Sequence, residues 1–232
     1  MKIIKNIKLK RNEEEILRYQ ECHNNKLKKV NNAIIKITRE EIERGHRLFE
    51  PKGISSSVKI KQIYFSSGTV DLINGFSLNF SPSIMNLLKG ASYLVFGVAT
   101  IGSSLENKVF ELFSQGEYPR AVALDAVGTV SVRSLSNYMR SLVCQESKEQ
   151  NLQTTKYFGP GSGNLDISQQ KNIFQIIPVD KIGVKLTESY MMVPQKSLSW
   201  IIGIGKNTTI PYKDNHSCQI CQATNCQFRK IF

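Results

Sequence analysis

The segment between residues 157 and 204 constrains the fold more than any other part of the sequence. It opens with a turn, Tyr157-Phe-Gly-Pro-Gly-Ser-Gly163, and two apolar runs follow, Gly183–Val193 and Ser197–Ile204. Glycine has no Cβ and adopts positive φ angles without strain, so three glycines leave the main chain of this turn accessible. The apolar runs predict two strands. We therefore expect a bare turn against which a flat ligand can lie, followed by two strands.

Helical and strand patterns follow one another irregularly along the rest of the chain. The pair Asn74-Gly75 predicts a β-hairpin over residues 70–78 with a type I′ turn. Further strands are expected over residues 57–65 and 92–99, and helices from residue 13, over 25–49, from 82, and over 105–113, 119–146 and 168–177. Because hairpin strands mix with helices without strict alternation, the sequence predicts an α+β fold with a twisted, largely antiparallel sheet flanked by helices.

Composition divides the chain into three parts. We expect a basic N-terminal helical extension over residues 1–50, an α+β domain over 51–210 and a cysteine-rich tail over 211–232. No apolar run reaches the roughly 18 residues that cross a bilayer, and the first residues lack the apolar core of a secretion signal. The sequence therefore predicts a cytoplasmic protein with no membrane partner.

Positive charge is concentrated near the N-terminus. The formal net charge is +12, and residues 1–62 carry 16 Lys or Arg against 8 acidic residues. Three interpretations stay open: a footprint for nucleic-acid phosphates, a surface that attracts an acidic protein, and a solvated lysine-rich surface. The basic stretch has few aromatic residues for base stacking, and acidic runs such as Glu13-Glu14-Glu15 interrupt it, so nucleic acid is the least favoured partner.

Several short motifs occur in an order that resembles a known family. They are Gly97-Val-Ala-Thr-Ile-Gly102 with Leu105-Glu106, Ala123-Leu-Asp-Ala-Val-Gly128, the Pro-Gly turn, and Ile182-Gly-Val-Lys-Leu-Thr-Glu-Ser-Tyr-Met-Met192 followed by Pro194 and Lys196-Ser197, with a weaker match in Ile16-Leu-Arg-Tyr19. Together they resemble the activation domain of cobalamin (vitamin B12)-dependent methionine synthase and its small stand-alone homologues. The resemblance spans most of the chain.

This resemblance implies a domain that binds S-adenosylmethionine and supports the reductive remethylation of a corrinoid. The chain has no cobalamin-binding signature of the form DxHxxG, so the cobalamin is expected on a separate partner, a corrinoid-bearing methyltransferase or methionine synthase core. A flavodoxin- or ferredoxin-like protein is the expected electron donor. The side chains would hold the methyl donor close to the cobalt rather than perform acid–base chemistry, so no catalytic residue is assigned.

The family pattern also suggests ligand-binding residues, and this chain departs from it at two positions. The family arginine three residues before the proline of the turn is Tyr157 here, with Lys156 as the nearest cation, and the family tyrosine after Pro-Gly is Ser162. A lysine cannot reproduce the bidentate contact of a guanidinium with a carboxylate. The expected ligand-binding residues are Lys156, Tyr157, Pro160, Gly161, Ser162, Gly163, Glu188 and Tyr190.

Glu188 has two interpretations. In an alternating strand it shares a face with Leu186 and Tyr190, where its carboxylate could lie near the sulfonium or the ribose of the ligand. It could equally stand in water on an edge strand, because a buried carboxylate without a partner is costly. The sequence does not choose between them.

The C-terminal tail carries three cysteines, Cys218, Cys221 and Cys226, with CxxC-x4-C spacing. Thiolates at this spacing can converge on zinc or an iron–sulfur cluster, and His216, Cys144 or Cys22 could supply a fourth ligand. Reduced free thiols are the alternative. These features leave a second functional hypothesis, a non-catalytic interaction protein that carries a metal or cluster and keeps the fold after losing S-adenosylmethionine binding.

Overall fold

An antiparallel sheet forms the centre of the protein. The computed structural model describes residues 1–20, 31–161 and 165–208, and within them seven strands pair in the order β4-β3-β2-β5-β9-β6, with β1 beside β2. The strands of this sheet are β1 (Lys2–Lys5), β2 (Lys52–Tyr64), β3 (Thr69–Leu72), β4 (Ser77–Asn79), β5 (Tyr93–Thr100), β6 (Gln153–Thr154) and β9 (Ser197–Gly205). A separate two-stranded hairpin consists of β7 (Lys185–Leu186) and β8 (Met192–Val193).

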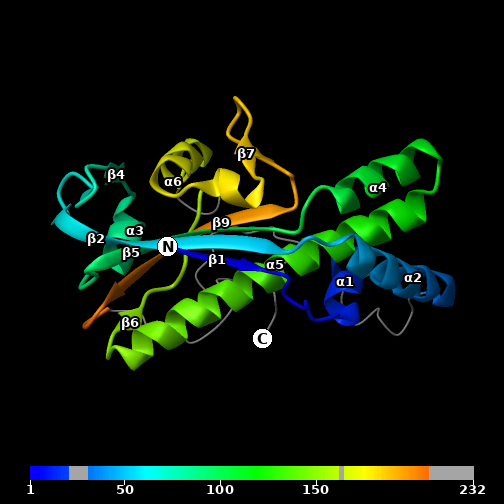
Figure 1. Cartoon of the computed structure of the whole chain (residues 1–232), viewed down its shortest axis with the longest axis horizontal. Coiled ribbons are helices and arrows are strands. Elements are labelled where there is room, and N and C mark those ends of the chain that lie inside the picture. Colours follow the sequence, from blue (N-terminus) through cyan, green and yellow to red (C-terminus); the bar gives the residue numbers. More distant parts are fainter. Residues whose placement is uncertain (21–30, 162–164, 209–232) are drawn as a thin grey trace.

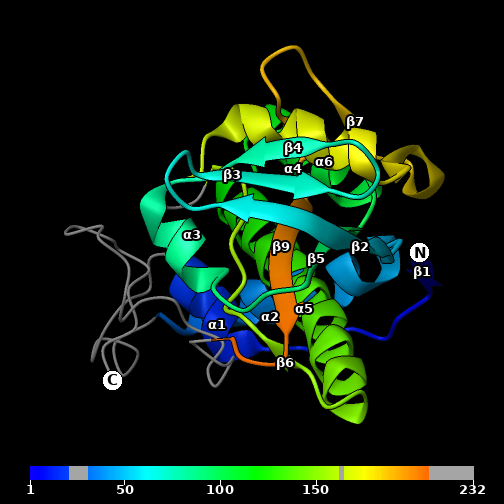
Figure 2. The same cartoon turned by 90° about the vertical axis from the view of Figure 1, so that its left-hand side faces the viewer.

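Helices cover both faces of the sheet and extend beyond one end of it (Figure 1). The long helix α5 runs under one face, α3 and α6 lie on the other, and α1, α2 and α4 gather around the first half of α5. The helices are α1 (Glu13–Tyr19), α2 (Asn32–Leu48), α3 (Pro82–Leu87), α4 (Ser104–Ser114), α5 (Tyr118–Glu149) and α6 (Gln170–Ile176), with short 3₁₀ turns at Ile167–Gln169 and Val179–Ile182. Figure 2 shows the sheet in the foreground with α5 crossing behind it.

The central strand β5 is buried on both faces. Its even-numbered residues, such as Phe96, join the core under α3 and α6, whereas Val95 and Ala99 join the core against α5. Gly97 makes room for the buried indole of Trp200, because a Cβ at Gly97 would lie 2.1 Å from Trp200 Cζ2. Burial of both faces explains the continuous apolar run of this strand.

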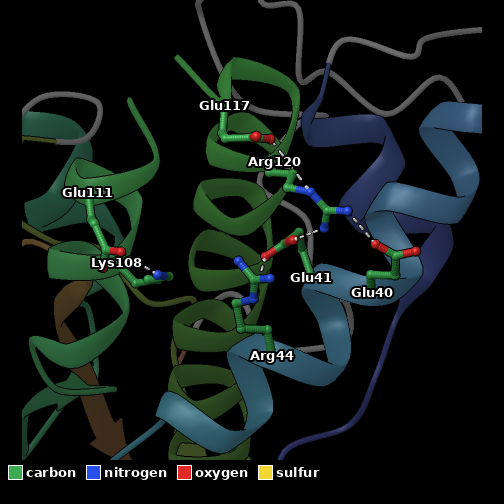
Figure 3. A network of polar contacts seen from close by, with 7 residues as sticks. All are labelled: Glu40, Glu41, Arg44, Lys108, Glu111, Glu117 and Arg120. Carbon is green, nitrogen blue, oxygen red and sulfur yellow. Dashed lines mark hydrogen bonds and ion pairs between the residues drawn. The ribbon is translucent and has the colours of Figure 1, made fainter. Parts of the chain in front are cut away.

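A network of charged residues attaches α2 to the start of α5 (Figure 3). Arg120 lies 2.6 Å from Glu40 Oε2, 2.7 Å from Glu41 Oε1 and 3.7 Å from Glu117 Oε2, and Arg44 Nε lies 3.4 Å from Glu41 Oε2. The side chain of Glu41 is fully buried. A buried carboxylate needs a cation beside it, so we expect this Arg120 network to hold the helical layer together.

The structure confirms the α+β class and most elements expected from the sequence. The hairpin over residues 70–78 is present, but the type I′ assignment is wrong: the connection covers residues 73–76, and only Gly75 in it has a positive φ. Strand β2 begins at Lys52 rather than at residue 57. Within the helix expected over residues 25–49, α2 covers Asn32–Leu48 with Asn31 as its N-cap, and residues 25–30 lie outside the described residues. The strand β1 was not predicted, and the division at residues 50 and 210 stays a prediction.

The continuous strand expected over Gly183–Val193 is also wrong. The chain turns back after Leu186, so β7 and β8 form a short hairpin with Thr187–Met191 at its tip. The amide N–H of Thr187 donates to Met191 O at 2.9 Å, and Tyr190 takes a φ of +62° in the turn. The apolar composition of this run gave no sign of the turn: Tyr190 takes the positive φ that glycine usually takes, and the hydroxyl groups of Thr187 and Ser189 close the turn with side-chain hydrogen bonds.

Candidate functional site

The glycine-rich turn runs along the outer edge of β9. The amides and carbonyls of Phe158 and Ile201 pair in both directions, at 3.0 and 2.7 Å, and Thr155 N donates to Gly203 O at 2.9 Å. A Cβ at Gly159 would lie 2.8 Å from Ser199 O, so only glycine fits this close approach to β9. We call the described part of this turn, residues 156–161, the bend.

The tip of the bend is open to solvent. Gly161 is exposed and has a φ of +76°, Pro160 is half-buried, and Phe158 and Gly159 are buried against the sheet. The N–H of Gly161 donates to Leu165 O at 3.0 Å. The bend therefore offers accessible main chain at Gly161, whereas Ser162 and Gly163 lie outside the described residues.

An arginine that the sequence did not single out lies beside the bend. Arg140, on α5, places its Cζ 3.6 Å from the ring centroid of Tyr157. Only 5% of Arg140 is exposed, and its guanidinium donates to Ser136 Oγ at 2.8 Å and to Asn137 Oδ1. A guanidinium from another element thus lies against the residue that stands in place of the family arginine. Arg140 and Tyr157 are 17 positions apart in the sequence, and no local pattern predicted this contact.

Lys156 is half-buried at the start of the bend and forms no ion pair within the part of the chain that the structure describes. Its carbonyl accepts a hydrogen bond from Thr155 Oγ1 at 2.9 Å. Lys156, in the bend, and Arg140, against the ring of Tyr157, are thus two cations next to the bend.

The predicted residues Glu188 and Tyr190 lie on the β7–β8 hairpin. Glu188 is exposed at the hairpin tip and makes no hydrogen bond or ion pair with the described residues, which fits the interpretation of a carboxylate in water. Tyr190 is half-buried in the same turn. No polar contact of the described chain ties Glu188 to the bend, so its part in a ligand site stays a prediction.

Three of the motifs that carry the family resemblance meet at Lys196. Its ammonium lies 2.8 Å from Asp125 Oδ1 and donates to Thr129 Oγ1 at 2.9 Å, both on α5. Glu106 Oε2, on α4, accepts the backbone N–H groups of Gln195 at 2.7 Å and Lys196 at 3.4 Å. We call Glu106, Asp125, Thr129 and Lys196 the Lys196 cluster. No pattern in the sequence predicted that these residues meet.

A cavity of about 240 Å³ lies elsewhere, between the second half of α5, the sheet and β1. Ser55 and Tyr93 from the sheet, and Val143 and Glu146 from α5, contribute to its walls, and Lys2 pairs with Glu146 at its side. None of the residues that line it belongs to the bend. The cavity is therefore a feature separate from the candidate site.

The metal site expected in the tail cannot be placed on the structure. Cys218, Cys221 and Cys226 lie outside the described residues, as do His216 and Cys22. Cys144, on the second half of α5, is described, and its thiol lies 3.2 Å from Thr154 Oγ1 on β6. Among residues 1–20, 31–161 and 165–208, no three His, Cys, Asp or Glu side chains gather to hold a metal ion. The tail site stays a prediction.

The chain was compared with protein-family models, curated proteins and solved structures. No protein-family model matches the chain, and no curated protein does so either. Among solved structures, the crystal structure of the MetH reactivation domain bound to AdoHcy matches with a TM-score of 0.64 and 12% sequence identity, covering 93% of this chain and 80% of that chain. This chain therefore has the fold of that reactivation domain. No helix in the described part is long and apolar enough to cross a membrane.

Proposed function

We propose that this chain is an S-adenosylmethionine-binding activation module, which supports reductive remethylation of the corrinoid of a separate cobalamin-dependent methyltransferase. The observation that carries the proposal is the likeness, over 93% of the chain, to a reactivation domain that holds AdoHcy. AdoHcy is the demethylated form of the proposed ligand. The order of the sequence motifs and the open main chain at Gly161 support the same conclusion.

The bend is the part of the molecule that we assign to the ligand. The missing side chain of Gly161 lets a flat purine or ribose approach the main chain closely. Lys156 would meet the carboxylate of the methionine portion, because Arg140 is too deeply buried to reach it directly. Arg140 would add positive potential and fix the ring of Tyr157 by stacking over it.

The work of the chain would be to position its ligand. S-adenosylmethionine supplies the methyl group and leaves as S-adenosylhomocysteine, while an external one-electron donor reduces the cobalt of the partner. The residues of the bend would hold the sulfonium at a fixed place and orientation, which is how binding energy lowers the barrier of a group transfer. The net charge of +12 would attract an acidic electron donor such as a flavodoxin- or ferredoxin-like protein.

Equilibrium dialysis with labelled S-adenosylmethionine tests the proposal. We expect saturable binding that Gly161→Val weakens by about tenfold, because the added side chain covers the accessible main chain and meets Ile167. Gly75→Val is the matched control: Gly75 also has a positive φ, of +88°, and lies in an open turn at the far hairpin. Lys156→Ala should weaken binding as well, since it removes the cation for the carboxylate.

The absence of binding at millimolar ligand would contradict the proposal and favour the second hypothesis, a non-catalytic interaction protein. That hypothesis has one observation of its own, namely Tyr157 in place of the family arginine. Anaerobic purification followed by iron, sulfide and zinc analysis would then test whether the tail cysteines carry a metal. Stoichiometric metal in a protein that binds no S-adenosylmethionine is the result that this alternative predicts.

A further inference from the structure

Lys196 stands between the β7–β8 hairpin, which carries two predicted ligand-binding residues, and β9, against which the bend lies. The β7–β8 hairpin with Glu188 and Tyr190 ends at Val193, and β9 begins at Ser197. The residues between them are held by polar contacts: Ser197 Oγ donates to Pro194 O at 2.7 Å, and Ile101 N donates to Lys196 O at 3.2 Å. Any movement of Lys196 would therefore shift the base of the hairpin and the start of β9 together.

The side chain of Lys196 is held more firmly than an ordinary surface lysine. Only 16% of it is exposed, and its ammonium contacts both Asp125 and Thr129. Gly128 lies under its stem, since a Cβ there would come within 3.3 Å of Lys196 Cε and 2.7 Å of Leu105 Cδ2. Asp125 and Thr129 thus accept from the ammonium, and the missing side chain of Gly128 leaves room for the stem. Glu106 binds the backbone N–H groups of Gln195 and Lys196.

Strand β9 connects Lys196 to the bend through direct backbone contacts. Three residues after Lys196, Ser199 O approaches Gly159 so closely that no side chain fits, and Ile201 pairs with Phe158. Ser199 Oγ also donates to Gln170 Oε1 at 2.7 Å, which joins the same stretch of β9 to α6. The start of β9 is thus the physical connection between the Lys196 cluster and the bend.

From this arrangement we propose that Lys196 is a positioning residue: its cluster fixes the β7–β8 hairpin and the bend relative to each other and so sets the geometry of the ligand site. The inference rests on the proposed function for its ligand, but its structural part can be measured without one. Lys196 itself does not touch the ligand. Its removal should loosen both segments at once while the rest of the sheet stays protected from exchange.

The test combines amide hydrogen exchange with ligand affinity in three variants. In Lys196→Met, we expect exchange to accelerate about tenfold over residues 185–193 and at the bend, and S-adenosylmethionine to bind about fivefold more weakly. Gly128→Ala keeps the lysine charge but crowds Leu105 and the lysine stem, so it should do the same. Lys108→Met is the matched control, because Lys108 forms an exposed pair with Glu111 on α4 outside the Lys196 cluster.

A core variant separates positioning from general loss of stability. Ile84→Ala, in α3, lowers global stability without touching the Lys196 cluster, so it should accelerate exchange in the core and leave the local exchange of the hairpin and the bend unchanged. If Lys196→Met and Gly128→Ala alter exchange and affinity no more than Lys108→Met, the inference is overturned. If wild-type protein binds no S-adenosylmethionine, the proposed function fails, and the exchange data still decide whether Lys196 fixes the two segments.

Discussion

Two clusters of charged residues attach α5 to its neighbours, and they differ in how deeply their carboxylates are buried. In the Arg120 network (Figure 3), the side chain of Glu41 is fully buried while that of Arg120 is 29% exposed. In the Lys196 cluster the cation is the more buried partner, since the lysine side chain is 16% exposed and that of Asp125 is 49% exposed. The first cluster joins helix to helix, and the second joins α5 and α4 to the strands of the candidate site.

The contrast shows that similar ion pairs can serve different purposes. A buried carboxylate that loses its cation keeps the full cost of its desolvation, so the Arg120 network should matter chiefly for stability. An exposed carboxylate is hydrated whether or not it is paired, so the Lys196 cluster should contribute little stability and act through the position of its backbone.

The largest effect is expected from Arg120→Ala. The substitution leaves Glu41 buried beside Arg44 alone, whose Nε is 3.4 Å away, and removes the partner of Glu40. We expect the free energy of unfolding to fall by about 3 kcal/mol, measured by urea denaturation. Adding Glu41→Gln should recover part of the loss, because the neutral side chain no longer requires a cation. A loss below about 1 kcal/mol for Arg120→Ala would remove the contrast between the two clusters.

A smaller stability effect is expected from Lys196→Met. Because Asp125 stays hydrated after the lysine is removed, the free energy of unfolding should fall by about 1 kcal/mol or less in the same urea experiment. The methionine still fills the space above Gly128, so the packing of α5 should be kept. A loss as large as that of Arg120→Ala would mean that the Lys196 cluster is a stability element, contrary to the comparison drawn above.

The smallest effect concerns the acid side of the stability curve. The hydrogen bond from Arg120 holds the pKa of Glu40 below its ordinary value of 4.5. A carboxyl group with a lowered pKa in the folded state stabilises the protein above the unfolded pKa, and this contribution disappears as the pH falls through the folded pKa. Urea midpoints measured from about pH 6 to about pH 3 should therefore fall less in Glu40→Gln than in wild type. Parallel curves for the two proteins would show that Glu40 is not coupled to folding.

Local signals in the sequence predicted most of the fold. Helix α1 begins at residue 13 as expected, and Asn12 caps it by accepting the N–H of Glu15 at 3.0 Å. Gly116, with a φ of +77°, follows α4 where the apolar pattern stops. The β7–β8 hairpin was missed because its turn depends on side-chain hydrogen bonds of Thr187 rather than on glycine. Residues close in sequence carry such signals, and they are enough to define most helices and strands.

The candidate site was predicted only in part, because its partners come from distant elements. The open main chain at Gly161 follows from the glycines themselves, but the contact of Arg140 with Tyr157 depends on how α5 crosses under the sheet. The same holds for Lys196, whose contacts Glu106 and Asp125 lie about 70 to 90 residues away. Periodicity and turn chemistry predict where helices and strands lie in the sequence, whereas contacts between side chains of distant elements depend on how the whole chain packs.

The central claim is that the bend binds S-adenosylmethionine, and an NMR titration of protein labelled with ¹⁵N at glycine tests it most directly. Gly159 and Gly161 report on the bend, and Gly68 and Gly75, around the β3–β4 hairpin, serve as internal controls. The account predicts saturable shifts of the Gly159 and Gly161 signals with S-adenosylmethionine and with S-adenosylhomocysteine, while Gly68 and Gly75 stay in place. Unchanged signals at Gly159 and Gly161 under millimolar ligand would contradict it.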